Sequence, residues 1–170
     1  MKKILSLVLV LSFLSSCKSK TEALESDNKA NTPKISECPE NAQCTQAILK
    51  NTALAIEDDG IGKPFYTVVE KTGTTVYQYK LTEDKDQQYV DGGYREEIVF
   101  ELPSNFKNGS ISGKPILQAK ALFGVFCYCK GKAGYYSIQE GTITKTDKAI
   151  VMEIPALVEG QKLRTIKIAL

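Results

Sequence analysis

Apolar and polar residues alternate over several short segments between residue 75 and the end of this 170-residue chain. Alternation with a period of two over four to eight residues is typical of half-buried β-strands. The apolar positions of these segments are, in chain order, Tyr77, Tyr79 and Leu81; Ile98, Phe100 and Leu102; Tyr136, Ile138 and Ile143; Ile150 and Met152; and Ile166 and Ile168. We therefore expect several strands, each with one face in a core.

Turn-forming pairs that contain glycine separate these segments. They lie at residues 59–60, 72–73, 91–93, 108–109, 130–131 and 159–160. Strands and turns spaced by roughly 8–12 residues are typical of an all-β sandwich or barrel. We predict a mainly β fold, with one antiparallel β-sandwich or barrel-like domain over residues 37–170. The composition of residues 42–55 and 114–123 permits a short helix in either place.

The first seventeen residues follow a different pattern. A basic start, Met1-Lys2-Lys3, precedes an apolar run over residues 4–14. This run is too short for a stable membrane-spanning helix, which needs about 20 apolar residues, but it suits a signal peptide. The next residues, Leu14-Ser15-Ser16-Cys17, resemble the lipobox of bacterial lipoproteins, in which small residues stand between a branched apolar residue and a cysteine.

This resemblance implies that residues 1–16 are a signal peptide and that Cys17 becomes the lipid-modified N-terminus, carrying diacylglycerol and a further acyl chain such as palmitate. Each buried CH₂ adds about 0.8 kcal/mol of membrane affinity, so the implied anchor is permanent. The implied partner is a membrane, and the implied location is the cell envelope. From Lys18-Ser19 and the Lys/Asn/Thr-rich composition we expect a Gram-negative outer membrane. The open alternative is a secretory signal with a chance cysteine.

Residues 17–36 are polar and of mixed charge after the cysteine. Such a composition cannot bury enough apolar surface to fold, so we expect a disordered tether behind which the domain begins. As a coil it would span roughly 25 Å, at about 5–6 Å times the square root of the residue number.

Charge and composition exclude several function classes. Removal of residues 1–16 takes two of the 22 Lys and Arg residues with it and leaves 20 charges of each sign. Nucleic-acid binding needs a basic excess on one face, so we expect no nucleic-acid partner. The chain has no histidine and no tryptophan. Ser-His-Asp and Cys-His catalysis and histidine-ligated zinc are therefore excluded.

Four cysteines remain besides Cys17: Cys38, Cys44, Cys127 and Cys129. An even number in an exported protein predicts two disulfides. On a strand over residues 122–130, Cys127 and Cys129 would share a face with Cα atoms roughly 6.5 Å apart and parallel Cβ vectors, which is unfavourable for a bond between them. We therefore favour bonds from this pair to Cys38 and Cys44. Local pairing, Cys38–Cys44 with Cys127–Cys129, stays open.

Two further chemistries are conceivable for these cysteines, and one for the acidic clusters. Thiol–disulfide exchange would need a labile Cys127–Cys129 bond, but the C-x-x-C spacing of oxidoreductases is missing. Zinc held by the four thiolates lacks the usual spacing. Residues 57–59, and residues 83–86 with Asp91, could hold calcium but do not have the register of a calcium loop. We assign no metal and no cofactor.

Aromatic residues form the remaining candidate site. Phe126 and Tyr128 would lie on the strand face opposite the cysteines, and Tyr135 and Tyr136 follow a flexible turn. We favour a central strand that is buried on both faces. The alternative is an aromatic surface formed by these four residues that stacks a glycan or an apolar ligand.

These observations lead us to expect a lipid-anchored, non-catalytic protein with a disulfide-bonded β domain. Its role would be binding or structural, at the cell surface or in the periplasm, with a protein, a glycan or an apolar small molecule as the ligand. One alternative is a lipocalin-like carrier of small ligands. A less favoured one is a thiol–disulfide oxidoreductase that uses Cys127 and Cys129.

Overall fold

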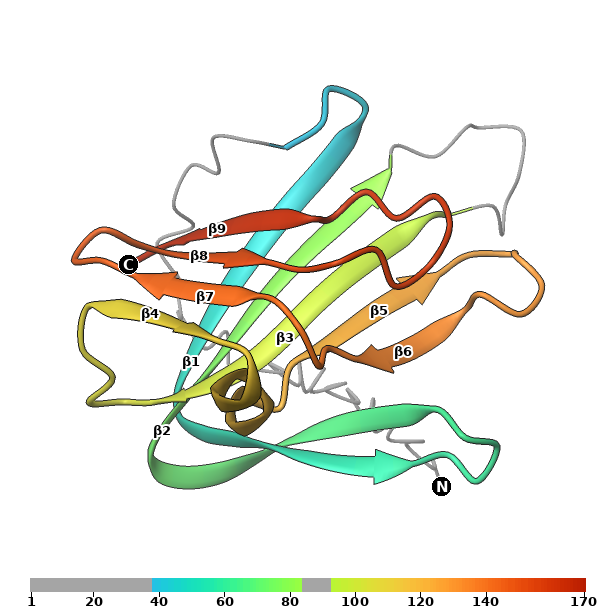
Figure 1. Ribbon diagram of the computed structural model, residues 1–170. Helices are drawn as coiled ribbons and strands as arrows, with labels where there is room; N and C mark the ends of the chain where they lie inside the picture. Colours follow the sequence, from blue (N-terminus) through green and yellow to red (C-terminus); the bar gives the residue numbers. More distant parts are fainter. Residues whose placement is uncertain (1–37, 84–92) are drawn as a thin grey trace, which may run out of the picture.

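Nine strands form two antiparallel sheets in the part of the chain that the computed structural model describes, residues 38–83 and 93–170 (Figure 1). Sheet A contains, in spatial order, β1 (Ala42–Asp58), β2 (Pro64–Glu83), β3 (Arg95–Pro103), β5 (Leu122–Phe126) and β6 (Gly134–Ser137). Sheet B contains β4 (Gly109–Ser112), β7 (Thr142–Lys145), β8 (Ala149–Glu153) and β9 (Thr165–Ala169). A short 3₁₀ helix, η1 (Lys114–Ala119), lies between β4 and β5.

The two sheets pack face to face, and side chains fill the space between them. Phe100 of β3 and Phe123 of β5 are fully buried in this core from sheet A, and Ile150 and Met152 of β8 are fully buried in it from sheet B. The mainly β fold is therefore confirmed. Of the two forms left open by the sequence, the structure has the sandwich, because the sheets do not close into a barrel.

One of the two permitted helices is wrong. Residues 42–55 belong to β1, which pairs with β2 along almost its whole length. Pairing with a strand rich in valine, threonine and tyrosine outweighs the modest helix propensity of alanine, leucine and lysine in this segment. The other permitted helix is confirmed in part, because η1 covers Lys114–Ala119 while the residues from Leu122 onward form β5.

The hairpin of β1 and β2 bends near its middle, so its outer half leaves sheet A (green, at the bottom of Figure 1). The pairing register shifts just after Lys50, Asn51 has a φ of 56°, and Gly73 has a φ of 83°. The turn predicted at residues 72–73 thus lies at a bend inside β2, where glycine adopts the positive φ without strain. We call the outer half, residues 52–70, the arm.

The arm covers the outer face of sheet A and forms a second, smaller core with it. Leu54 of the arm is 1% exposed. It packs with three buried residues of sheet A, namely Val76, Val99 and Leu122. The rings of Tyr66 on the arm and Tyr135 on β6 meet edge to face, with centroids 5.3 Å apart. The molecule therefore has three layers in this region: sheet B, sheet A and the arm.

Two buried carboxylates of β3 fasten the arm to sheet A. The backbone N–H of Leu54 donates to Glu101 at 2.6 Å, and Lys120 Nζ lies 3.2 Å from the same carboxylate. The Tyr66 hydroxyl donates to Glu97. Buried carboxylates need such partners, because an unpaired charge in the interior is costly.

The tip of the arm is fastened to β6. Lys63 Nζ donates to the carbonyl oxygen of Ala133 at 2.6 Å and to the Tyr136 hydroxyl at 3.0 Å. Gly134 leaves room for this side chain, since a Cβ at that position would lie 2.6 Å from Lys63 Cδ. The arm is thus held at its base, along its length and at its tip.

A side-chain amide bridges the edges of the two sheets. Gln46 of β1 donates to the carbonyl oxygen of Ala169 at 3.3 Å and accepts from the N–H of the same residue at 3.2 Å. Gln46 therefore makes with β9 the pair of bonds that a residue of a neighbouring strand would make.

The predicted signal peptide over residues 1–16, the lipidation site Cys17 and the tether up to residue 36 lie outside the described residues. So do Asp84, Asp86 and Asp91 of the second acidic cluster. Across residues 38–83 and 93–170, no helix is long and apolar enough to cross a membrane.

Candidate functional site

Strand register brings both disulfides to one end of sheet A. Cys44 of β1 pairs with Leu81, Leu81 with Glu96, and Glu96 with Val125 of β5. Cys127 follows two residues after Val125, and Cys38 is bonded to Cys44. We call this end, where the described chain also begins, the disulfide end.

Both disulfides are local, so the favoured cross-domain pairing is wrong. Cys38 bonds to Cys44 across a Cα–Cα distance of 5.7 Å, and Cys127 bonds to Cys129 across 5.2 Å. The physical reason is that β5 ends at Phe126, before the cysteines. The chain then bends at Cys127 and Tyr128. This bend brings together two side chains that would be parallel on a straight strand.

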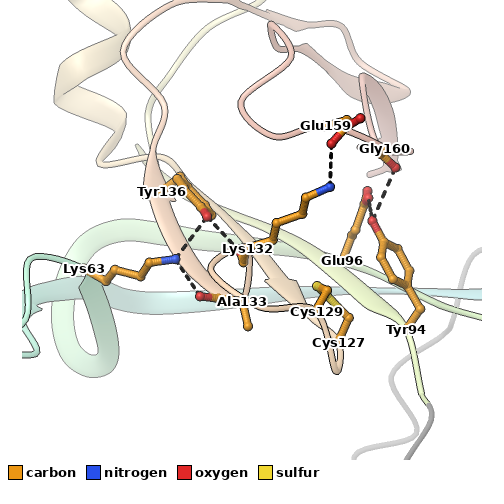
Figure 2. Close-up of a disulfide and its surroundings, with 10 residues drawn as sticks. All are labelled: Lys63, Tyr94, Glu96, Cys127, Cys129, Lys132, Ala133, Tyr136, Glu159 and Gly160. Carbon is orange, nitrogen blue, oxygen red and sulfur yellow. Dashed lines mark hydrogen bonds and ion pairs between the residues drawn. A yellow bond between two sulfur atoms is a disulfide. The ribbon is translucent and has the colours of Figure 1, made fainter.

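A loop of sheet B is tied to the disulfide end through a fully buried carboxylate. Glu96 accepts hydrogen bonds from the N–H groups of Lys162 at 2.7 Å and Leu163 at 2.6 Å, and from the Tyr94 hydroxyl. Burial and the neighbouring Glu96 carboxylate raise the pKa of Tyr94 above its ordinary value. Figure 2 shows Tyr94 and Glu96 beside the Cys127–Cys129 bond, with the ion pair of Lys132 and Glu159 joining the turn after Cys129 to the loop of sheet B. Glu96 and its neighbour Glu97 lie on opposite faces of β3, Glu96 toward the loop of sheet B and Glu97 toward the arm.

Two of the four predicted ligand-contact aromatics share a surface, and the other two do not reach it. Phe126 and Tyr128 line an open depression at the disulfide end, together with Thr82, Gly93, Tyr94, Arg95 and Cys127. The guanidinium carbon of Arg95 lies 4.1 Å from the Phe126 ring centroid. Tyr128 is 99% exposed, at the apex of the turn closed by the disulfide.

Tyr135 and Tyr136 pack elsewhere. Tyr135 lies behind Phe126, ring edge to ring face, and its hydroxyl is 3.4 Å from the Glu97 carboxylate. Burial, reinforced by Glu97, raises the pKa of Tyr135 to about 12. Tyr136 lies beneath Lys63 at the tip of the arm, and its hydroxyl donates to the carbonyl oxygen of Lys132 at 2.7 Å (Figure 2). The prediction that β5 is buried on both faces is confirmed only up to Val125.

The first acidic cluster organises the turn of the arm. Asp59 accepts hydrogen bonds from the N–H groups of Ile61 and Lys63, both at 2.9 Å, and these bonds lower the pKa of Asp59. Asp58 accepts from Gly60 at 2.8 Å. Within the described ranges, no three acidic or cysteine side chains gather in a way that could hold a metal ion.

A cleft opens at the opposite end of sheet A, beside the bend of β2. We call it the hinge cleft; its volume is about 370 Å³. It lies between the bend, the end of β3, β4 and η1, and is lined by Lys71, Gly73, Thr74, Glu101, Leu102, Pro103, Phe106, Ile111, Pro115, Gln118 and Ala119. Thr74, which lines the cleft, pairs with Pro103. At the disulfide end, Thr82 pairs with Arg95. The cleft and the disulfide end are thus eight residues apart along β2.

The lining of the hinge cleft combines an apolar floor with polar groups. Leu102 and Ala119 are buried, and Phe106 and Ile111 are half-buried, so the floor is apolar. The Glu101 carboxylate is already occupied by the Leu54 N–H and by Lys120. Pockets that bind small molecules typically combine an apolar lining with a few fixed polar groups, which is the arrangement found here.

Sequence reasoning missed the hinge cleft, although two signals pointed toward it. The turn signal at residues 72–73 marks the bend that forms one wall. Pro103 ends β3, and Pro115 lies in the first turn of η1. These two prolines line two other sides of the cleft. Glu101 alternates with apolar residues along the strand, which is the pattern of a solvent-facing position. Nothing in the local sequence reveals that the arm covers it.

Comparisons with protein families, with curated proteins and with solved structures find no match for this chain.

Proposed function

We propose that this protein is a lipid-anchored lipoprotein of the cell envelope, with a non-catalytic binding role. The Leu14-Ser15-Ser16-Cys17 lipobox supports the anchor. The two disulfides support export, because such bonds persist in oxidising compartments and are rare in the cytoplasm. We expect the outer membrane of a Gram-negative bacterium as the location.

The hinge cleft is the observation that carries the binding role. Its volume of about 370 Å³ falls within the range of about 300–1,000 Å³ that is usual for small-molecule sites. Its floor is apolar, and Lys71 at the rim is exposed. We therefore infer a small apolar ligand, and an anionic group on it would be favoured by Lys71. Because side chains fill the space between the sheets, the proposed site differs from the enclosed interior of a lipocalin-like carrier.

Lipidation is tested by the mass of the mature N-terminal peptide and by metabolic labelling with palmitate. The native chain should carry the label at Cys17 and fractionate with membranes. A Cys17→Ser variant should lose the label and remain uncleaved or soluble. A labelled, membrane-bound Cys17→Ser product would contradict the proposed anchor.

Ligand binding is tested with 8-anilinonaphthalene-1-sulfonate, an apolar aromatic anion, on the folded full-length chain. We expect saturable enhancement of its fluorescence. Gln118→Trp places a bulky ring in the hinge cleft and should abolish the enhancement. Leu117→Trp is the matched control, because Leu117 is the neighbouring η1 residue, is 54% exposed and does not line the cleft. Absent binding, or equal binding by both variants, would refute the hinge cleft as the site.

A second candidate function, thiol–disulfide exchange, is favoured by the local Cys127–Cys129 bond, since both cysteines are half-exposed. Its test is the reduction potential of this bond in glutathione buffers. Structural disulfides of secreted proteins have potentials below about −300 mV, whereas labile and catalytic ones lie higher. We expect a value in the structural range. A potential near that of the oxidoreductases would replace the binding proposal with the enzymatic one.

A further inference from the structure

We propose that the disulfide end of the domain rests on the lipid surface and that the Tyr128 side chain enters the membrane–water interface. The proposal rests on lipidation of Cys17 as set out above. It adds a direct contact between the folded domain and lipid, and an orientation in which the hinge cleft faces away from the membrane.

The described chain enters the domain at the disulfide end. Cys38 is the first described residue, and its bond to Cys44 holds it at the disulfide end. Residues 18–37 separate it from Cys17. If these twenty residues form the coil that the sequence predicts, their root-mean-square span is roughly 25 Å, and their full extension of about 70 Å is the upper limit on the distance between Cys38 and the lipid.

Tyr128 projects into solvent from the apex of a closed turn. The Cys127–Cys129 bond closes a turn around this residue, whose side chain is 99% exposed. Tyrosine is enriched at membrane–water interfaces, because its ring is apolar and its hydroxyl remains hydrated. The closed turn restrains the backbone around Tyr128, so only the side chain has to be ordered when the ring enters the interface.

Charges of both signs lie at the disulfide end. Lys132 is paired with Glu159, and Lys162 with Glu83. The exposed charges of Lys130 and Glu40 have opposite signs. Among the described residues, the charges of this end are therefore close to balanced, with the half-buried Arg95 as a further positive charge, so the contact should depend little on anionic lipid and persist at high salt.

The tether makes a weak contact sufficient. A short flexible linker gives an effective concentration of roughly millimolar between its two ends. One aromatic side chain would not hold a free domain on a bilayer, but it can bias the orientation of a domain that is already anchored nearby.

The experiment uses the lipidated full-length chain in vesicles of phosphatidylethanolamine and phosphatidylglycerol, with and without brominated acyl chains. The chain contains no tryptophan, so Tyr128→Trp introduces its sole indole emitter. We expect emission at shorter wavelength and quenching by the brominated lipid, both unchanged at high salt. Leu117→Trp is the control. Leu117 is exposed on η1, which comes before the first residue of β5, whereas Cys127 follows the last residue of that strand. Leu117 therefore lies away from the disulfide end. Its emission should remain unquenched.

A second measurement tests the native Tyr128 side chain itself, because tryptophan prefers the interface more strongly than tyrosine does. A Lys130→Trp reporter should be quenched more strongly with Tyr128 present than in the double variant with Tyr128→Ser. Equal quenching in these two chains would overturn the role of Tyr128.

Other outcomes discriminate between the two proposals. If the chain is lipidated and floats with vesicles but neither the Tyr128→Trp variant nor the Leu117→Trp variant is quenched, the lipid contact is wrong while the anchor stands, and Tyr128 is then free for a protein partner. Quenching of the Leu117→Trp variant alone would overturn the orientation. A chain without lipid that fails to float would overturn the anchor and, with it, this inference.

Discussion

Shortening Leu54 to alanine tests whether the arm is an integral third layer of the domain. Leu54 is 1% exposed and packs between the arm and sheet A. Leucine-to-alanine changes in cores cost about 2–5 kcal/mol, and less where the structure can close over the cavity. The arm is a two-stranded layer with solvent on its far side, so it can settle toward sheet A. We therefore expect a loss of about 2–3 kcal/mol in the free energy of unfolding.

This variant isolates packing from hydrogen bonding. The contact between Leu54 and Glu101 uses the backbone N–H of Leu54, which alanine retains. Any loss therefore reports the apolar contacts of the side chain and leaves the buried carboxylate paired.

Urea unfolding of the oxidised chain measures the effect, and amide hydrogen exchange locates it. Val68→Ala is the matched control, because Val68 pairs with Leu54 across the hairpin but is 38% exposed. It should cost less than about 1 kcal/mol. In Leu54→Ala the amides of the arm should exchange faster than those of β8. The reasoning would be refuted if Leu54→Ala cost no more than Val68→Ala, or if exchange in the arm did not change.

Three other perturbations test the remaining parts of the fold. Replacing both Cys38 and Cys44 by serine opens a seven-residue loop and should cost about 2 kcal/mol in urea unfolding, whereas cross-domain pairing would have predicted about twice that. Glu96→Gln should cost about 2 kcal/mol, because hydrogen bonds to a charged group are lost, and Glu83→Gln, at a partly exposed ion pair, should cost less than about 1 kcal/mol. Absorbance titration should show tyrosines ionising above pH 10, because the pKa values of four are raised: Tyr66, Tyr77, Tyr94 and Tyr135. Their raised pKa stabilises the fold below pH 10, and this stability should fall as the pH rises to about 12, with a shallower fall in Tyr135→Phe.

The strands of the sandwich could be predicted where the alternation of residues reflects one buried and one exposed face. This condition holds for Ile150 and Met152 of β8 and for Ile166 and Ile168 of β9, which face the core. It fails in β3, where Glu97, Val99 and Glu101 are as buried as their apolar neighbours. The arm covers that face, and the contact between arm and sheet joins residues about 45 positions apart in sequence. Local periodicity carries no information about such a layer.

The two disulfides illustrate a different limit. The correct partners depended on where β5 ends, and element boundaries are less well determined by periodicity than the elements themselves. A strand continued to residue 130 keeps Cys127 and Cys129 apart, whereas a bend after Phe126 joins them. The aromatic cluster was divided for the same reason: Tyr128 is on the turn, and Tyr135 and Tyr136 are on β6.

The amide of Gln46 has a consequence for how the molecule behaves in crowded surroundings. The outer strand of an open sheet offers unpaired backbone groups to strands of other molecules, which is a route to aggregation. On β9 the Gln46 side chain occupies both backbone groups of Ala169, and Lys167 places an exposed charge along the same strand. An intruding strand would have to displace that amide and bury that charge. At Ala169 the edge of β9 is therefore closed to pairing with a strand of another molecule.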